Sequence, residues 1–332
     1  MSTIVKVKNL KKYFPIKLSF FRTLLSKSEL SVRAVDGISF EIKKGEIFGL
    51  AGESGSGKTT TGRLLLRLIE PTEGTIYFEN KDITHLRDTQ MRPLRRKMQI
   101  IFQDPYESLN PRMTVGDIVA EPLRVLEATH SDTEAQERVK STLEDVELTP
   151  PEEFMFRYPH EVSGGQRQRV AVARAFVLTP DFIVADEPVS MLDVSIRAEI
   201  LQLMYRLVEK NKTAFLYITH DLALARHMCD RLAIMYLGKI MEMDTTEQIV
   251  YEPLHPYTKA LIDAVPVPDP TAKRIEVVIK GEIPSPVNPP PGCRFHTRCP
   301  AIIGDICRTK EPPLIDTGNN HMVACHLHSK GK

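Results

Sequence analysis

The chain of 332 residues has no tryptophan, only 7% aromatic residues and five cysteines. It also has no run approaching the roughly 18 to 20 apolar residues that span a bilayer, and its first residues, MSTIVKVKNL, lack the apolar core of a secretory signal. Formal net charge is only +1, from 44 basic and 43 acidic side chains, so no global field steers the chain toward nucleic acid or an anionic membrane. These absences predict a soluble, cytosolic protein that binds any such partner through a local patch.

What is present fits an ordinary globular protein. Hydrophobic residues make up 42% and charged residues 26%, which excludes wholesale disorder, collagen and a long coiled coil. At about 150 residues per domain, the length predicts about two domains.

The first 36 residues hold eight Lys and Arg against Glu29 and Asp36, a local excess of +6. Within them, LSFFRTLL (Leu18 to Leu25) is a short apolar run. It is either an amphipathic segment that lies on a membrane or partner protein, or a solvated insertion between two strands. The insertion is the favoured interpretation.

Apolar runs alternate with helix-compatible sequence. EIFGLA (Glu46 to Ala51), DFIVAD (Asp181 to Asp186) and TAFLYITH (Thr213 to His220) read as buried strands that end in polar groups. Alternating strands and helices predict an α/β fold with a largely parallel sheet, whose ligands lie at the strand ends. Residues from about 105 to 178 are mostly helix-compatible and predict a helical insertion.

A phosphate-binding loop follows the first of these strands. Gly52 to Thr59 reads G-E-S-G-S-G-K-T and satisfies G-x-x-x-x-G-K-[ST], so backbone N–H groups and a helix N-terminus can surround phosphate oxygens. Lys58 can reach the β and γ phosphates, and Thr59 supplies a hydroxyl for Mg²⁺. The residues expected to bind ATP here are Gly52, Glu53, Ser54, Gly55, Ser56, Gly57, Lys58, Thr59 and Thr60.

Two further elements suit a nucleotide. Asp186 and Glu187 end an apolar strand, where the aspartate can hold Mg²⁺ and the glutamate can polarise an attacking water. Ser163, Gly164 and Gly165 precede the helix QRQRVAVARAFVL and form a second anion-binding helix start. Because the chain has one lysine-bearing loop, we expect the second helix start to contact ATP held by another subunit.

Together these motifs resemble the ATP-binding cassette ATPases over about residues 3 to 260. GESGSGKT resembles the Walker A loop, IFQDP the Q-loop, VSGGQ the signature, FIVADE the Walker B strand, ITHD the switch region and SMLD the D-loop. Two positions depart from the family pattern. Met191 stands in the D-loop where Ala is common, and Val162 opens the signature where Leu is usual. The resemblance implies a RecA-like core with an antiparallel β subdomain and a helical subdomain at about 105–178. The resemblance also assigns site residues. It implies catalytic roles for Glu187, His220 and Gln103, and Mg²⁺ binding by Thr59, Gln103 and Asp186. It implies ATP contacts by Ser163, Gly164, Gly165, Gln166 and Asp193, and adenine stacking on Tyr13 or Phe14.

A narrower resemblance, carried by YPHEVSGGQRQR, HPYTKAL and GEIPSPVNPPPGCRFHTRCP, is to the oligopeptide and dipeptide importer ATPases. DPYESLNPR and DEPVSMLDVS resemble the second, F-type subunit of that group. The resemblance implies a paralogous ATPase partner in a heterodimer, with a homodimer possible in isolation. It also implies two membrane permeases, a peptide-binding protein and a place at the cytoplasmic face of a prokaryotic inner membrane. The rival reading is a soluble cassette ATPase acting on nucleic acid or ribosomes, which the near-neutral charge and the single cassette disfavour.

The C-terminal region differs in composition. Prolines from Pro266 to Pro291 predict an extended tether, so we expect a cassette at 1–262 and a tether with a four-cysteine domain at 263–332. Five, seven and seventeen residues separate Cys293, Cys299, Cys307 and Cys325, which fits neither the usual zinc nor the simple ferredoxin spacing. The importer resemblance implies a [4Fe–4S] cluster on these four residues, with zinc or free or oxidised thiols as alternatives. The cluster is expected to have a structural role, so that replacing Cys293 or Cys299 should disorder the tail while leaving ATP binding largely intact.

Overall fold

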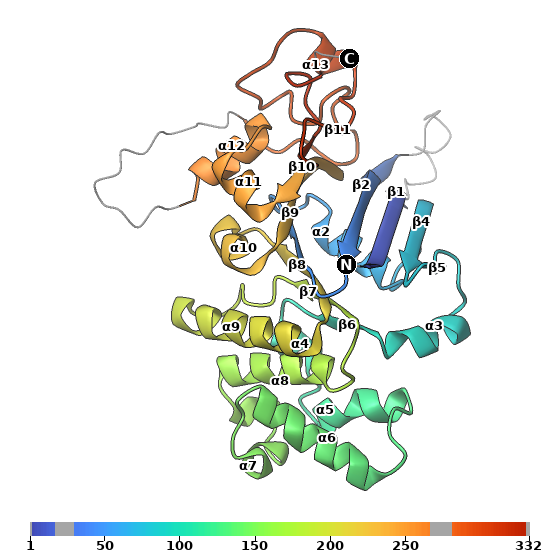
Figure 1. Cartoon of the computed structure of the whole chain (residues 1–332), viewed down its shortest axis with the longest axis vertical. Coiled ribbons are helices and arrows are strands. Elements are labelled where there is room, and N and C mark those ends of the chain that lie inside the picture. Colours follow the sequence, from blue (N-terminus) through green and yellow to red (C-terminus); the bar gives the residue numbers. More distant parts are fainter. Residues whose placement is uncertain (1, 17–29, 266–280, 330–332) are drawn as a thin grey trace. The chain divides into compact units, whose positions relative to one another are not determined.

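The computed structural model describes residues 2–16, 30–265 and 281–329 (Figure 1). The run Leu18 to Leu25 and the prolines of 266–280 lie outside these residues, and their predictions stay predictions. Contacts divide the chain into two compact units. The helical unit comprises Met1–Val5, Ile42–Ile47 and Phe78–Ile218, and the phosphate-loop unit comprises Lys6–Glu41, Phe48–Tyr77 and Thr219–Lys332.

Parallel strands form the centre of the helical unit. β6 (Met98–Ile101), β7 (Phe182–Asp186) and β8 (Ala214–Thr219) lie in this order, with β7 pairing in parallel to both neighbours. Every residue of β7 and β8 is buried, which is why each reads as a continuous apolar run rather than an alternating one. The unit also contains β5 (Lys81–Asp82), α3 (Asp88–Arg95) and α9 (Val194–Asn211).

All regular elements described between Pro105 and Phe176 are helical. They are α4 (Pro105–Ser108), α5 (Val115–Val125), α6 (Asp132–Asp145), α7 (Pro151–Met155), the 3₁₀ helix η1 (Pro159–Glu161) and α8 (Gly164–Phe176). Helix α5 buries Val115, Ile118, Val119 and Leu123, one apolar stripe, and packs on α6 and α8. Thr114 and Ser131 begin α5 and α6 by accepting a backbone N–H of the first turn.

The phosphate-loop unit contains strands of both orientations. β1 (Thr3–Pro15), β2 (Ser31–Lys43) and β4 (Glu73–Phe78) lie side by side in the order β2-β1-β4. β3 (Ile47–Ala51) pairs in parallel with β9 (Arg231–Tyr236), which forms an antiparallel hairpin with β10 (Lys239–Thr245). The helices are α2 (Lys58–Leu65), α10 (Leu222–Met228), α11 (Thr246–Tyr251), α12 (Pro256–Asp263) and α13 (Ile306–Thr309).

Cys229, the fifth cysteine, is a core residue of this unit. A Cβ atom on Gly49 of β3 would lie 2.7 Å from its sulfur, so glycine at 49 makes room for the thiol. Burial raises the pKa of Cys229, which therefore packs as a small apolar side chain.

The C-terminal residues join the same sheet. β12 (Met322–Val323) pairs antiparallel with β10 and with β11 (Ile315–Asp316), and the Ala324 N–H donates to the Met241 carbonyl at 2.8 Å. In Figure 1 these strands lie beside β10 in the upper part of the picture. The boundary at 262 stays a prediction, but residues from 281 onward pack in the same unit as the phosphate loop. In the described part of the chain, no helix has the length and apolarity needed to cross a membrane.

Candidate nucleotide-binding site

The predicted phosphate loop lies between β3 and α2 and already has an inward-facing lysine. Lys58 is buried, and its Nζ donates to the carbonyls of Gly52 at 2.8 Å and of Glu53 at 3.0 Å. Gly57, with φ of 104°, is the N-cap of α2, so the first N–H groups of that helix face the loop. A loop of backbone amides at a helix N-terminus, with an ammonium beside it, is suited to bind phosphate oxygens.

Close backbone contacts explain two of the loop glycines. A Cβ atom on Gly52 would lie 2.1 Å from the Met235 carbonyl oxygen, and one on Gly57 would lie 2.1 Å from that of Ala34. Both glycines also have positive φ angles, which other residues rarely adopt. The loop is therefore packed directly on the backbones of β9 and β2.

Glu53, one of the residues expected to bind ATP, has a side chain that is paired within the protein. Its carboxylate accepts two hydrogen bonds from Arg298, at 2.7 and 3.0 Å, and its N–H donates to the Tyr257 hydroxyl at 3.0 Å. The bond to Glu53 is the main cause that raises the pKa of Arg298. Sequence reasoning missed Arg298 and Tyr257, and the only signal available was that Arg294 and Arg298 adjoin two of the tail cysteines in CRFHTRC.

The two aromatic candidates on β1 have different surroundings. The Tyr13 hydroxyl donates to Asp36 at 2.5 Å, and the Arg33 guanidinium lies 5.6 Å from the ring centroid. Burial and the bond to Asp36 raise the pKa of Tyr13. Phe14 is exposed, with Lys12 Nζ 5.0 Å from its ring centroid. Asp36 lies on β2, two residues after Ala34, whose carbonyl oxygen faces Gly57 of the loop. The hydrogen bond to Asp36 therefore connects Tyr13 to the part of β2 that packs on the loop.

Two predicted catalytic residues meet in the helical unit. The Gln103 Nε2 donates to Glu187 Oε2 at 3.3 Å. Glu187 directly follows β7, has a φ of 46° and donates its N–H to the Ile218 carbonyl at 3.0 Å. A non-glycine residue in this region stores backbone strain, which is a feature of functional positions. Asp186, the last residue of β7, is buried.

The signature forms the N-terminus of α8. Ser163 is the N-cap and makes a capping box with Gln166, whose side chain accepts the Ser163 N–H at 2.9 Å while its own N–H donates to the Ser163 hydroxyl at 3.3 Å. A Cβ on Gly165 would lie 2.9 Å from Ile196 Cγ2 of α9, whereas one on Gly164 would meet only Leu192 Cδ2 at 4.0 Å. Gln166 therefore orders the helix start, and Gly164 keeps an open face.

The remaining predicted residues divide between the units. Asp193 is the N-cap of α9 and makes no side-chain capping bond, while the Ser190 hydroxyl donates to the Glu187 carbonyl at 3.0 Å. His220 directly follows β8 and is exposed. Lys58, Thr59 and His220 belong to the phosphate-loop unit, and Gln103, Asp186 and Glu187 belong to the helical unit.

The four tail cysteines are free thiols. Cys293 and Cys325 are buried, Cys299 and Cys307 are half-buried, and the Cys293 N–H donates to the Cys307 carbonyl at 2.9 Å. Burial raises the pKa of Cys293 to about 12 and also raises the pKa of Cys299 and of Cys325. Among the described residues, no three His, Cys, Asp or Glu side chains are arranged to hold a metal ion. Tetrahedral zinc, with Zn–S near 2.3 Å, needs such a compact group. A metal-binding extension is therefore not shown.

Comparison with known proteins identifies the family. A family model described as "ABC transporter" matches residues 35–190, and one described as "Oligopeptide/dipeptide transporter, C-terminal region" matches residues 241–307. The oligopeptide transport ATP-binding protein AppF of Bacillus subtilis (strain 168) is 47% identical over 330 residues, 98% of each chain. The chain belongs to the ATP-binding proteins of ABC transporters. This cassette is equally similar, at 47% over 326 residues, to a probable peptide ABC transporter ATP-binding protein, y4tS, of Sinorhizobium fredii, and covers 90% of it.

Solved cassettes confirm the fold class. A dimeric ATP-binding cassette with ADP and phosphate bound, MJ0796, aligns with a TM-score of 0.63 at 31% identity, over 73% of this cassette and 99% of that chain. CbiO1 of Clostridium perfringens aligns with a TM-score of 0.64 at 25% identity, over 76% of this cassette and 92% of that chain. The predicted P-loop ATPase fold of the ABC type, and ATPase activity with it, are thereby confirmed.

Proposed function

We propose that this cassette is the ATP-hydrolysing subunit of an importer for oligopeptides or dipeptides. The observation that carries the proposal is the oligopeptide/dipeptide transporter region at residues 241–307, joined to an ABC cassette in one chain that matches a peptide transport protein over nearly its whole length. The rival, a soluble cassette acting on nucleic acid or ribosomes, has no such support.

ATP binding is assigned to the phosphate loop. The amides of Gly52 to Thr60 and the Lys58 ammonium bind the phosphates, and the face of Tyr13 stacks on adenine. Tyr13 is preferred to Phe14 because its hydroxyl is fixed by Asp36, beside the strand that touches the loop. When bound, Mg²⁺ neutralises phosphate charge, and the Thr59 hydroxyl, Asp186 carboxylate and Gln103 amide are oxygen donors of the type it prefers.

Hydrolysis is assigned to residues that follow the central strands. Glu187 orients and polarises the attacking water, and the Gln103 amide, 3.3 Å away, orients the Glu187 carboxylate. His220 contacts the γ-phosphate and stabilises the charge that develops on it. The strained backbone of Glu187, bonded to Ile218, fixes the direction of its side chain.

A second ATPase subunit completes the site. Ser163 and Gly164 of one subunit would contact ATP on its partner, which agrees with the open face of Gly164 and with exposed Met191 and Val194 beside the D-loop. The partner is a paralogous subunit in a heterodimer. Two permeases, which receive peptide from a binding protein, would bind exposed aromatic residues of the helical unit such as Tyr106 and Phe156, at the cytoplasmic face of a prokaryotic inner membrane.

The metal prediction rests on the donor set of the tail. Four thiols of Cys293, Cys299, Cys307 and Cys325 lie in one region, where their charges would affect one another. Soft thiolates suit an iron–sulfur cluster, [4Fe–4S] by resemblance, before zinc. Anaerobic purification followed by iron, sulfide and zinc analysis tests this: a chain with none of the three would reject a resident metal.

The test of the function is a Glu187→Gln variant recovered from membranes in ATP. We expect it to bind ATP, to hydrolyse it at least about 100-fold more slowly, and to copurify with two permeases and a second ATPase subunit. Glu209→Gln, an exposed glutamate of α9, is the matched control and should hydrolyse normally. Ribosomes or nucleic acid in place of permeases would support the rival, and normal turnover would remove Glu187 from catalysis.

A further inference from the structure

We infer that the tail segment Cys293–Cys299, the docking segment, positions the nucleotide-binding elements of this chain, so that nucleotide affinity depends on Arg298 and Arg294. Both arginines lie far along the chain from their partners. Arg298 contacts the loop expected to bind phosphate, and Arg294 contacts Asp36, which accepts a hydrogen bond from Tyr13. The inference rests on the proposed function in one respect, that Gly52 to Thr59 is the phosphate-binding loop.

Arg298 controls the loop end of the site. It forms a two-pronged ion pair with Glu53, 245 residues earlier, and the side chains are 8% and 23% exposed. The backbone carbonyl of the same Glu53 accepts a hydrogen bond from Lys58. A planar guanidinium that bonds both carboxylate oxygens fixes orientation as well as position. Arg298 therefore fixes the residue that in turn orients the phosphate-binding lysine.

Arg294 contacts Asp36, the residue that holds the proposed adenine-stacking ring of Tyr13. Its Nη2 donates to Asp36 Oδ2 at 2.5 Å, 258 residues earlier, and both side chains are 7% exposed. The other oxygen of Asp36 accepts from the Tyr13 hydroxyl. Although burial opposes it, the Tyr13 bond and the charges of Lys239 and Arg294 lower the pKa of Asp36. The carboxylate thus remains charged and joins the tail to the proposed adenine-stacking ring.

An aromatic anchor between the two arginines holds the docking segment. Phe295 is fully buried, with its ring 5.4 Å from that of Tyr236 and 5.1 Å from that of Tyr257. The Tyr257 hydroxyl accepts the Glu53 N–H, so the anchor itself touches the loop. Three residues within five positions, Arg294, Phe295 and Arg298, therefore hold the segment against both Asp36 and the phosphate loop.

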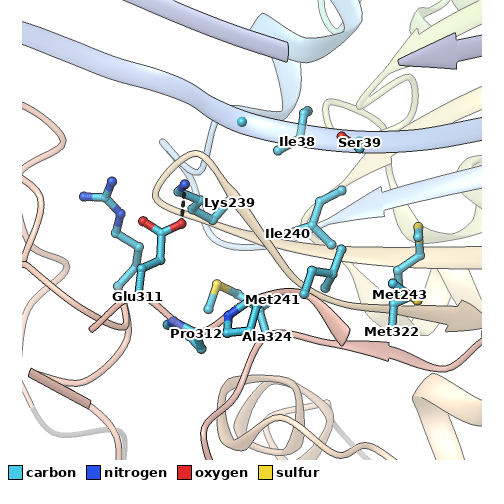
Figure 2. Close-up of a pocket in the computed structure, with 14 residues that line it drawn as sticks. Ile38, Ser39, Lys239, Ile240, Met241, Met243, Glu311, Pro312, Met322 and Ala324 are labelled. Atoms are coloured by element: carbon cyan, nitrogen blue, oxygen red, sulfur yellow. Dashed lines mark hydrogen bonds and ion pairs between the residues drawn. The ribbon is translucent and has the colours of Figure 1, made fainter. Parts of the chain in front are cut away.

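Another part of the tail lies against β10. A cavity of about 360 Å³ lies between them, bordered by the ion pair of Lys239 with Glu311 and by Met241, Met243 and Met322 (Figure 2). Arg294 of the docking segment also borders this cavity. Removing one partner of a buried pair leaves the other charge unpaired. This argues against a tail whose loss leaves ATP binding intact.

The test is the affinity of the full chain for ADP, measured by isothermal titration. ADP lacks the γ-phosphate that dimer closure needs, so it reports on the half-site of one chain. We expect Arg298→Gln and Glu53→Gln each to weaken ADP binding about tenfold, and the double variant to be no weaker than either alone. Arg308→Gln is the matched control, because Arg308 is a 61% exposed tail arginine paired with Asp305 at 3.9 Å, and it should bind ADP normally.

Two further measurements separate positioning from folding. Amide exchange in residues 52–59 should quicken in Arg298→Gln while the melting temperature stays within a few degrees of the unmodified chain. If Arg298→Gln does not fold, Arg298→Lys should still weaken ADP binding, because lysine keeps the charge but cannot donate to both carboxylate oxygens of Glu53 in the same planar geometry. Arg298 and Arg294 variants that fold and bind ADP within twofold of the unmodified chain would overturn the inference. Normal ADP binding by Lys58→Ala would instead overturn the phosphate-loop assignment itself.

Discussion

At the scale of single residues, burial decides which side chains can carry charge. His255 is fully buried at the start of α12, and its Nδ1 accepts the Tyr257 N–H at 2.9 Å. Burial lowers the pKa of His255 from 6.5 to about 3. Between these values the unfolded chain binds a proton that the folded chain does not, so stability falls as pH decreases from 6.5 toward 3.

His255→Asn keeps a side-chain acceptor at the helix start but does not titrate. We expect its urea midpoint to change less than that of the unmodified chain as pH is lowered from about 7 to about 4.5. Equal slopes for the two proteins would show that His255 does not contribute to the acid sensitivity.

The two glycines of the signature are expected to have different roles, Gly165 in packing and Gly164 in contact with the nucleotide. Gly165→Ala places a methyl group 2.9 Å from Ile196 and should cost about 1–3 kcal/mol of stability. Gly164→Ala meets nothing nearer than 4.0 Å and should melt normally, yet lose the ATP-trapped dimer if Gly164 faces the partner's nucleotide. Thermal melting and size-exclusion chromatography in ATP measure the two effects. A trapped dimer of full strength in Gly164→Ala would contradict the assignment.

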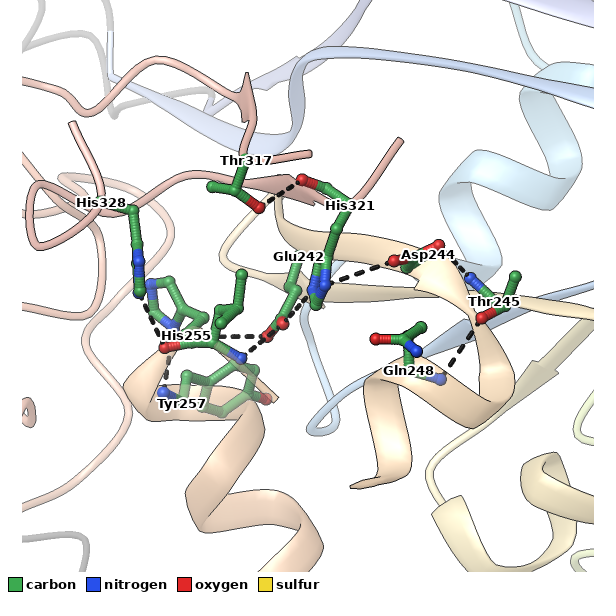
Figure 3. Close-up of polar contacts among 10 residues, drawn as sticks. Glu242, Asp244, Thr245, Gln248, His255, Tyr257, Thr317, His321 and His328 are labelled. Atoms are coloured by element: carbon green, nitrogen blue, oxygen red, sulfur yellow. Dashed lines mark hydrogen bonds and ion pairs between the residues drawn. The ribbon is translucent and has the colours of Figure 1, made fainter. Parts of the chain in front are cut away.

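At the scale of elements, one histidine directly before β12 links the tail to β10. His321 lies between Glu242, at 2.7 Å, and Asp244, at 3.3 Å, and Glu242 also accepts the N–H groups of Leu254 and His255 (Figure 3). Glu242 is fully buried, so it needs each of these donors. The short strand β12 is thus held by a polar contact as well as by its backbone pairing.

His321→Leu should destabilise the docking of β12 by about 3 kcal/mol, because it leaves Glu242 with one donor fewer. His321→Gln restores an amide donor and should be milder. Amide exchange of residues 315–325 is the measurement, and faster exchange in the leucine variant than in the glutamine variant is expected. Identical exchange in both would show that backbone pairing alone holds the strand.

At the scale of the whole molecule, exposed apolar residues mark where a second subunit would bind. Val194 is 81% exposed at the first turn of α9, beside exposed Met191. In a Glu187→Gln background, Val194→Glu should abolish the ATP-trapped dimer without changing the melting temperature. Tyr205→Glu, at an exposed apolar position further along α9, is the control and should still form the dimer. Loss of the dimer in both variants would indicate a general effect of charge on α9.

The site was predictable where its chemistry is local. Lys58 bonds carbonyls only five and six residues away, and Ser163 caps with Gln166 three residues on, so a short motif contains the whole arrangement. The contact between Gln103 and Glu187, 84 residues apart, was not predicted from the sequence. The proposal of Tyr13 over Phe14 rests on a contact with Asp36 of another strand, which neighbours on one strand do not reveal.

The sequence by itself therefore determined the cassette, its order of motifs and its transporter family, since each motif is a contiguous stretch whose backbone geometry its own residues dictate. Only the tertiary structure decided that the tail contacts the loop at Gly52 to Thr59, that the Glu53 carboxylate pairs with Arg298, and that His321 reaches a buried carboxylate. The physical reason is that an ion pair leaves no periodicity in sequence. An arginine can pair with any carboxylate that the fold brings within reach, and for Arg298 the fold brings one from 245 residues away.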